Sequence, residues 1–189
     1  MSKALSLSAR TLGCSERTLR RGVGEGLIRG RRVAGLGLEL SQQEEAYLTT
    51  HWDLLSGLRS ALRTERGVRL AVLFGSSAVG EDGRTSDVDL LVVRSDSSAH
   101  ALAGLRLRLG RVLGRRMHVV DLEQAQTTPT MLADVLDEGR VLVDRDGLWA
   151  QLRERSSEVG AAAEREEQAL ATGALEAVEA ARERIAAAA

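Results

Sequence analysis

The 189-residue chain is 43% apolar, which is enough for a hydrophobic core, and it can hold one ordinary domain plus a smaller module. Its single cysteine, Cys14, excludes an internal disulfide framework and a cysteine-based zinc cluster. No apolar run approaches membrane-spanning length, and residues 1–10 lack the apolar stretch of a signal peptide. We therefore expect a cytoplasmic protein without a membrane partner.

The net charge of −1 is unevenly distributed along the chain. Residues 1–40 contain eight lysines and arginines against three glutamates, a charge of +5, which leaves −6 for the remainder. A basic segment followed by an acidic one indicates two modules with different partners.

The basic segment begins with the pattern of two short helices. The first is predicted over Ala9–Leu12, and Gly13-Cys14 forms a turn before Ser15 caps the second. Leu27–Arg29 and Arg31–Ala34 are predicted as two short strands, and the glycines that follow suit a flexible junction.

This pattern resembles a winged bacterial helix-turn-helix, which implies DNA as a partner. The residues expected to contact bases or phosphates are polar and mostly basic: Arg17, Thr18, Arg20, Arg21, Arg29, Arg31 and Arg32. So few contacts per chain imply a homodimer for useful affinity. The alternative is a solvated basic helix that only packs on the rest of the protein.

Further along, the hydrophobic pattern predicts a compact domain between long helices. Ser41 and Glu44 have capping-box spacing and begin a helix that runs to about Thr64. The elements predicted after it are four strands and three helices: Val68–Phe74, a short helix opened by the turn Gly75–Gly80, Val88–Val93, Ser98–Gly114, Arg116–Leu122, Pro129–Glu138 and Arg140–Val143.

From Leu148 the sequence is rich in Ala, Glu and Arg and predicts one long helix, broken near Gly160 and Gly173. The expected division has four parts: 1–40 a helix-turn-helix module, 41–66 a linking helix, 67–145 the core domain, and 146–189 the C-terminal helix.

Two short motifs in the core domain carry chemistry. Asp87 and Asp89 are separated by one residue at the start of a strand, so both carboxylates project from the same face. Paired oxygen donors suit Mg²⁺, or Mn²⁺, that also binds substrate phosphates. Gly75 and Ser76 follow the preceding strand, where backbone amides and a hydroxyl can hold phosphates. Each motif alone is also typical of an ordinary strand end or turn, and the site requires the two strands to pair.

Together, Leu73–Ala78 and Ser86–Val92 resemble the minimal nucleotidyltransferases of the DNA polymerase beta superfamily, and the resemblance extends over Val68–Asp144. It implies an α/β (α+β) fold, with a small mixed sheet and flanking helices, preceded by the winged module and followed by the long helix. It also implies that Gly75 and Ser76 contact the triphosphate of an NTP, expected to be ATP, and that Asp87 and Asp89 ligate Mg²⁺. Several such proteins are antitoxins that adenylylate a partner toxin, often of HEPN type.

Two positions depart from the family's pattern. The family usually has an arginine where this chain has Val79. It also has a third carboxylate where the aligned residue here is His118, and Asp121, three residues on, points to the other face of a regular strand. His118 could itself serve as the base, or it could be an ordinary strand residue.

The sequence is therefore compatible with two functions. The first is a nucleotidyltransferase that moves AMP to a protein or small-molecule hydroxyl, in an autoregulating antitoxin with a cognate toxin. The second is a DNA-binding regulator whose nucleotidyltransferase domain is inactive.

Overall fold

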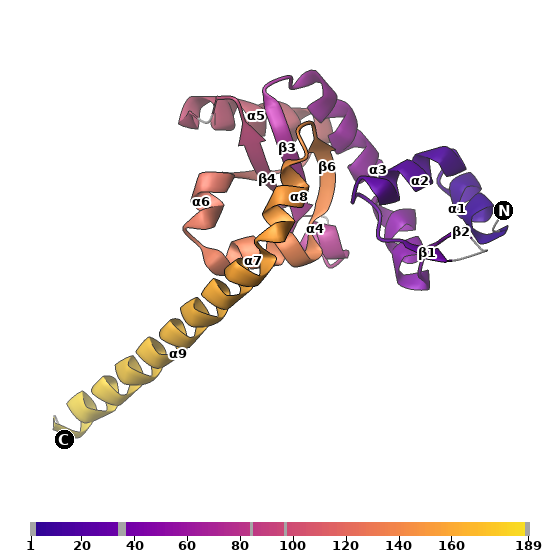
Figure 1. Cartoon of the computed structure of the whole chain (residues 1–189). Helices are drawn as coiled ribbons and strands as arrows, with labels where there is room; N and C mark the ends of the chain where they lie inside the picture. The colour runs from indigo at the N-terminus through magenta and orange to yellow at the C-terminus, as the bar shows by residue number, and fades with distance from the viewer. Residues whose placement is uncertain (1–2, 34–36, 84, 97, 188–189) are drawn as a thin grey trace.

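The computed structural model describes residues 3–33, 37–83, 85–96 and 98–187 (Figure 1). The N-terminal module consists of two helices and a β-hairpin: α1 (Lys3–Thr11), α2 (Glu16–Gly24), β1 (Arg31–Val33) and β2 (Gly37–Glu39). Ser15 caps α2 as predicted, since its hydroxyl accepts a hydrogen bond from the Thr18 amide.

Three predictions for this module were wrong. The first helix begins at Lys3, because Leu5 and Ala9 share one buried face. Leu27 and Ile28 are buried beneath α2 without forming a strand. The antiparallel strands are instead Arg31–Val33 and Gly37–Glu39, so Gly37 belongs to a strand. Ala34 and Gly35, the other residues of the predicted strand end and junction, lie outside the described residues.

The second sheet is four-stranded with the order β5-β4-β3-β6. Its strands are β3 (Val68–Phe74), β4 (Val88–Arg94), β5 (Met117–Asp121) and β6 (Arg140–Asp144). β3 is antiparallel to β4 and to β6, whereas β4 and β5 are parallel. The mixed sheet and its flanking helices are those of the predicted polymerase-beta-like fold.

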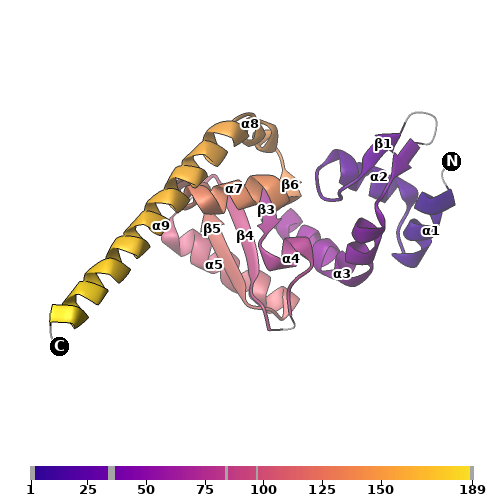
Figure 2. The same cartoon turned by 90° about the horizontal axis from the view of Figure 1, so that it is seen from below.

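Helices cover both faces of this sheet (Figure 1 and Figure 2). α3 (Gln42–Thr64) and α5 (Ala99–Leu113) pack on one face, where Leu55, Leu58 and Leu105 are fully buried. The same hydrophobic cluster continues into the N-terminal module, so α3 stabilises both parts.

The other face is covered by shorter helices and by the start of the C-terminal helix. These elements are α6 (Leu122–Gln126), α7 (Pro129–Glu138), α8 (Leu148–Glu154) and α9 (Ser156–Ala187). The break in the C-terminal segment falls at Arg155, and α9 runs through Gly160 and Gly173. The prediction of breaks at these glycines was wrong because a glycine costs a helix only about 1 kcal/mol.

The first turns of α9 are fastened to the sheet domain. Val159 and Ala163 are buried, and the Glu166 carboxylate accepts hydrogen bonds from the Thr130 amide and hydroxyl at the start of α7. Beyond this point α9 extends away from the rest of the protein (Figure 1 and Figure 2). None of the helices within the described ranges is both long enough and apolar enough to span a membrane.

Candidate active site

The two sequence motifs meet at one edge of the sheet. β3 ends at Phe74, which is the direct partner of Asp89 across the antiparallel pair. Gly75 and Ser76 follow Phe74, and Asp87 stands one residue before β4. The strand pairing that the site requires is therefore present, and it brings the glycine turn beside the paired aspartates.

The turn after β3 depends on Gly75. Its backbone angles, φ +67° and ψ −160°, lie in a region that is essentially restricted to glycine. A Cβ at this position would stand 2.8 Å from the Asp89 Oδ2 atom. The backbone at Gly75 therefore approaches the Asp89 carboxylate more closely than a residue with a Cβ would allow.

The short helix α4 (Ser76–Val79) follows the turn, and two side chains donate hydrogen bonds to its carbonyls. The Tyr47 hydroxyl donates to the Ser77 carbonyl at 2.9 Å, and Arg140 Nε donates to the Ala78 carbonyl at 2.7 Å. Two consecutive carbonyls of α4 are therefore fixed, which orients its Gly75-Ser76 end toward Asp89.

Arg140 is itself held by a buried network. Its guanidinium forms two hydrogen bonds with the Glu44 carboxylate, at 2.6 and 2.9 Å, and lies 3.5 Å above the centre of the Tyr47 ring. Glu44 also accepts from the Arg29 amide at 3.0 Å, which ties the N-terminal module to the same network. The Ser41 hydroxyl does cap α3 as predicted, but the Glu44 carboxylate binds Arg140 instead of closing a capping box.

Nitrogen-bearing side chains from β5 and from the residue before it lie beside both aspartates. His118 is the direct partner of Asp89, with 3.0 Å between His118 Nδ1 and Asp89 Oδ1. Arg116 Nε donates to Asp87 Oδ1 at 2.7 Å. Asp121 lies at the far end of β5, where its carboxylate accepts from the Gln124 amide and caps α6. Of the two candidate third positions, the structure places only His118 beside the aspartates.

The segment before Asp87 is anchored through Asp82. Arg115 donates both to Asp82 Oδ2 and to the Ser86 carbonyl, each at 2.9 Å, and His51 Nε2 lies 2.7 Å from Asp82 Oδ1. Burial raises the pKa of Asp82, but hydrogen bonds from His51 and Arg115 outweigh it and hold the pKa below its usual range. Sequence reasoning missed this cluster because its members are far apart in the chain.

The donor set fits a divalent cation that also binds substrate phosphates. Asp87 and Asp89 are partly exposed, and each uses one oxygen in the contacts above, so the other oxygen can ligate a metal. Within the described residues, no group of three or more His, Cys, Asp and Glu side chains is placed to hold a metal. Mg²⁺ in such sites usually takes only one or two carboxylates, and phosphates and water complete its coordination.

The residues predicted to contact DNA lie on more than one surface of the N-terminal module. α2 carries Arg17, Thr18, Arg20 and Arg21, while Arg29, Arg31 and Arg32 lie at the hairpin. Several are already engaged: Arg20 with Glu16, Arg31 with Glu39, and Arg29 with the Glu138 carbonyl. Their role in DNA binding stays a prediction.

A comparison with protein families finds a match over the part of the chain that holds this site. Residues 57–147 match the family described as polymerase beta, nucleotidyltransferase. The match includes the glycine turn, both aspartates, His118 and Arg140, and confirms that part of the resemblance seen in the sequence. No curated protein matches the chain significantly.

Solved structures share the fold of the domain that holds this site. A crystal structure described as a toxin–antitoxin with AMP-PNP matches with a TM-score of 0.54 and 23% identity, over 64% of this chain and 98% of that chain. A structure of tri-AMPylated Shewanella oneidensis HEPN toxin in complex with MNT antitoxin matches with a TM-score of 0.50 and 20% identity, over 64% of this chain and 95% of that chain. At this level of identity, the likeness concerns the fold.

Proposed function

We propose that the protein is a Mg²⁺-dependent nucleotidyltransferase that moves AMP from ATP to an acceptor hydroxyl. The observation that carries this proposal is the approach of the Gly75 turn to Asp89, because it brings backbone amides suited to phosphate beside a pair of partly exposed carboxylates. The family match over residues 57–147 supports the same chemistry.

In this mechanism the residues of the chain have separate tasks. The Gly75-Ser76 turn binds the triphosphate through backbone amides and the Ser76 hydroxyl. Asp87 and Asp89 hold Mg²⁺ or Mn²⁺, which neutralises phosphate charge when bound. The acceptor oxygen forms a bond to the α-phosphorus as the bond to the β-phosphate oxygen breaks, and pyrophosphate leaves. His118 accepts the proton of the acceptor hydroxyl.

We further propose that the acceptor is a hydroxyl of a cognate toxin, so that the protein acts as an antitoxin. The names of the similar structures support this, since one is a toxin–antitoxin with AMP-PNP and another contains an AMPylated HEPN toxin. We also propose that the protein acts in the cytoplasm.

The direct test is transfer of labelled AMP. The full chain is incubated with ATP labelled in the α-phosphate, Mg²⁺ and the co-expressed product of a neighbouring gene. Asp87→Asn with Asp89→Asn should abolish labelling and metal-dependent ATP binding. A matched control, Asp134→Asn with Asp137→Asn, removes two exposed carboxylates from α7 and should leave both unchanged. If the intact protein binds no ATP in the presence of Mg²⁺ or Mn²⁺, the proposal fails.

The second candidate function is a DNA-binding regulator with an inactive nucleotidyltransferase domain. The ion pair of Arg116 with Asp87, and the presence of His118 and Val79, favour it. Arg20 and Arg32 line one hollow beside the hairpin, so Arg20→Ala with Arg32→Ala should abolish sequence-selective binding of duplex DNA by a homodimer. Equal affinity for every duplex, with only a steep dependence on salt, would contradict selective binding.

A further inference from the structure

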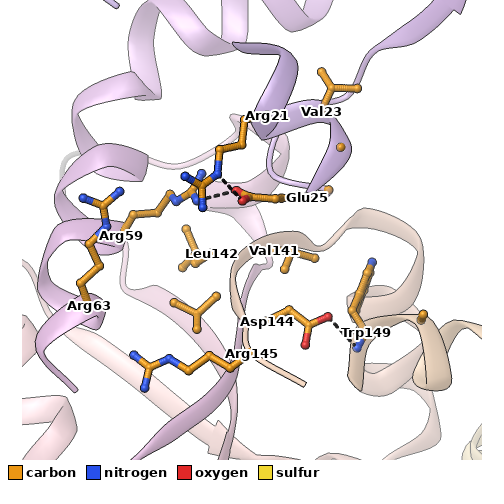
Figure 3. A pocket seen from close by; sticks show the side chains of 14 residues that line it. Arg21, Val23, Glu25, Arg59, Arg63, Val141, Leu142, Asp144, Arg145 and Trp149 are labelled. Atoms are coloured by element: carbon orange, nitrogen blue, oxygen red, sulfur yellow. Dashed lines mark hydrogen bonds and ion pairs between the residues drawn. The ribbon is translucent and has the colours of Figure 1, made fainter. Parts of the chain in front are cut away.

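A basic groove lies between the N-terminal module and the nucleotidyltransferase domain. It consists of two adjoining pockets, of about 330 Å³ and about 590 Å³, which share Arg21, Arg59 and Arg63. The smaller pocket lies between α2 and α3. The larger one continues past Glu25 to β6 and Trp149 (Figure 3). We call the two pockets together the inter-helix groove.

The groove has a surplus of positive charge. The arginines that line it are Arg17, Arg21, Arg59, Arg63 and Arg145. The carboxylates that line it are Glu25 and Asp144. Glu25 is shared between Arg21 at 2.6 Å and Arg59 at 2.5 Å (Figure 3). Asp144 accepts from the amides of Leu148 and Trp149 at the start of α8. The lining therefore carries five positive charges against two negative ones.

Two of these arginines are free to bind a ligand. Arg17 and Arg63 are exposed, and no residue in the described part of the chain forms a hydrogen bond or ion pair with either guanidinium. Arg145 donates to the carbonyls of Arg66 and Leu62, so it closes the end of α3 and no carboxylate pairs with it there. These groups make the groove a site for anions.

Each pocket also contains a tryptophan. Trp52 lines the smaller pocket, together with the hydroxyls of Thr18, Ser56 and Ser60. Trp149 lines the larger one, where its half-buried indole stands beside Val141 (Figure 3). Indole rings provide flat apolar surfaces on which bases stack, and the hydroxyls and arginines provide donors for phosphates.

We propose that the inter-helix groove binds a single strand of nucleic acid, with phosphates on its arginines and bases on Trp52 and Trp149. Alternating cationic and aromatic groups along connected pockets are typical of single-strand sites. Pockets of about 330 and 590 Å³ have the size of small-ligand sites, so each suits one or a few nucleotides. Arg17 and Arg21, which the sequence predicted to contact duplex DNA, are assigned to the single-stranded nucleic acid instead. This site is independent of the proposed transfer reaction.

The first test measures affinity with the full chain. The probe is a fluorescent oligo(dT) of about ten nucleotides, within the roughly 4–16 that a single-strand site covers. Arg17→Glu with Arg63→Glu should weaken binding at least about tenfold. Arg63→Ala should make the slope of log K against log salt concentration shallower by about 0.7, which is the share of one phosphate contact on a single strand. Arg111→Glu is the matched control, because Arg111 is an exposed arginine on α5 outside the groove. Equal losses in the control and in the variant Arg17→Glu with Arg63→Glu would overturn the proposal.

The second test locates the bound strand. The chain has two tryptophans, one in each pocket, so Trp52→Phe leaves only Trp149 as a fluorescent reporter and Trp149→Phe leaves only Trp52. Oligo(dT) should quench both, and Arg63→Glu should remove the quenching. Unlabelled duplex of the same length, ATP and poly-glutamate are tested as competitors. If any of them displaces the strand at equal concentration of charged groups, the groove is a duplex, mononucleotide or acidic-peptide site and the proposal is wrong.

Discussion

Asp89 and His118 face each other across the parallel strands β4 and β5, with 3.0 Å between the carboxylate Oδ1 and the imidazole Nδ1. The residue expected at this position in related nucleotidyltransferases is a third carboxylate. An imidazole here can accept a proton from an acceptor hydroxyl, but it adds no negative charge for a metal. This edge of the site can therefore supply a base for the acceptor hydroxyl, but it supplies no third acidic ligand for a metal.

If His118 is the base, His118→Ala should lower the rate of AMP transfer by about 10²-fold, the lower end of what a general base contributes. His118→Asp should restore much of the rate, since a carboxylate can take the same role. His100→Ala, at an exposed position in α5, is the control and should have no effect. The measurement is the initial rate of labelling of the acceptor. An unchanged rate in His118→Ala would show that the imidazole is an ordinary strand residue.

Gly75→Ala tests the close approach of the turn to Asp89. The new Cβ would stand 2.8 Å from Asp89 Oδ2, on a backbone that only glycine readily adopts. We expect a loss of about 1–3 kcal/mol in the free energy of unfolding, together with loss of nucleotide binding. Gly114→Ala is the comparison, because Gly114 also has a positive φ of +63° but a Cβ there meets nothing within 4 Å. Denaturant unfolding measures the loss of stability in both variants.

The contribution of the Asp89 contact can be separated with a double-mutant cycle. Gly75→Ala should cost less in an Asp89→Ala background, because the carboxylate that meets the new Cβ is absent. Identical costs in both backgrounds would assign the whole effect to the backbone angles.

Arg140→Met tests the buried network behind α4. Arg140 and Glu44 are 2% and 3% exposed, so removal of the guanidinium leaves a carboxylate buried without its partner. We expect a loss of about 3–5 kcal/mol in denaturant unfolding. The double change Arg140→Met with Glu44→Gln should recover part of this loss. Arg31→Met, which breaks an exposed pair with Glu39, should leave the unfolding midpoint nearly unchanged. Additive costs in the double variant would contradict the coupling.

Tyr47 provides a direct measurement of the same network. Burial raises the pKa of Tyr47 to about 12; the positive charge of Arg140 lowers it, whereas Glu44 and Asp82 raise it further. Tyr47 is the chain's one tyrosine, so tyrosinate absorbance reports this residue alone. The folded protein should titrate near 12, and the denatured protein near the ordinary value of about 10.

The raised pKa also determines how stability depends on pH. Because the neutral phenol is favoured in the folded state, its contribution is complete below pH about 10 and is lost as pH rises toward 12. The loss in the free energy of unfolding should be on the order of 2–3 kcal/mol, because each unit of difference between the folded and unfolded pKa corresponds to about 1.4 kcal/mol. Titration of the folded protein near pH 10 would show that the ring is open to water.

Local patterns in the sequence predicted most of the elements. Ser15, Ser41 and Ser98 each cap the helix expected after them, because a cap depends on an amide three residues away. The apolar run of β3 and the Gly75 turn also follow from short-range rules. These features placed the two motifs of the site, and the resemblance to a known family indicated that the two motifs belong to one site.

The tertiary structure decided the pairings between distant residues. Glu44 and Arg140 are 96 residues apart, and the capping pattern around Glu44 indicated a different partner. His51 and Asp82 are 31 residues apart, and neither belongs to a recognisable motif. The helix break at Arg155 depends on the packing of α8 and α9 against the sheet. Such contacts are chosen by the burial of charge and the fit of packed helices in the whole fold, and no short segment carries that information.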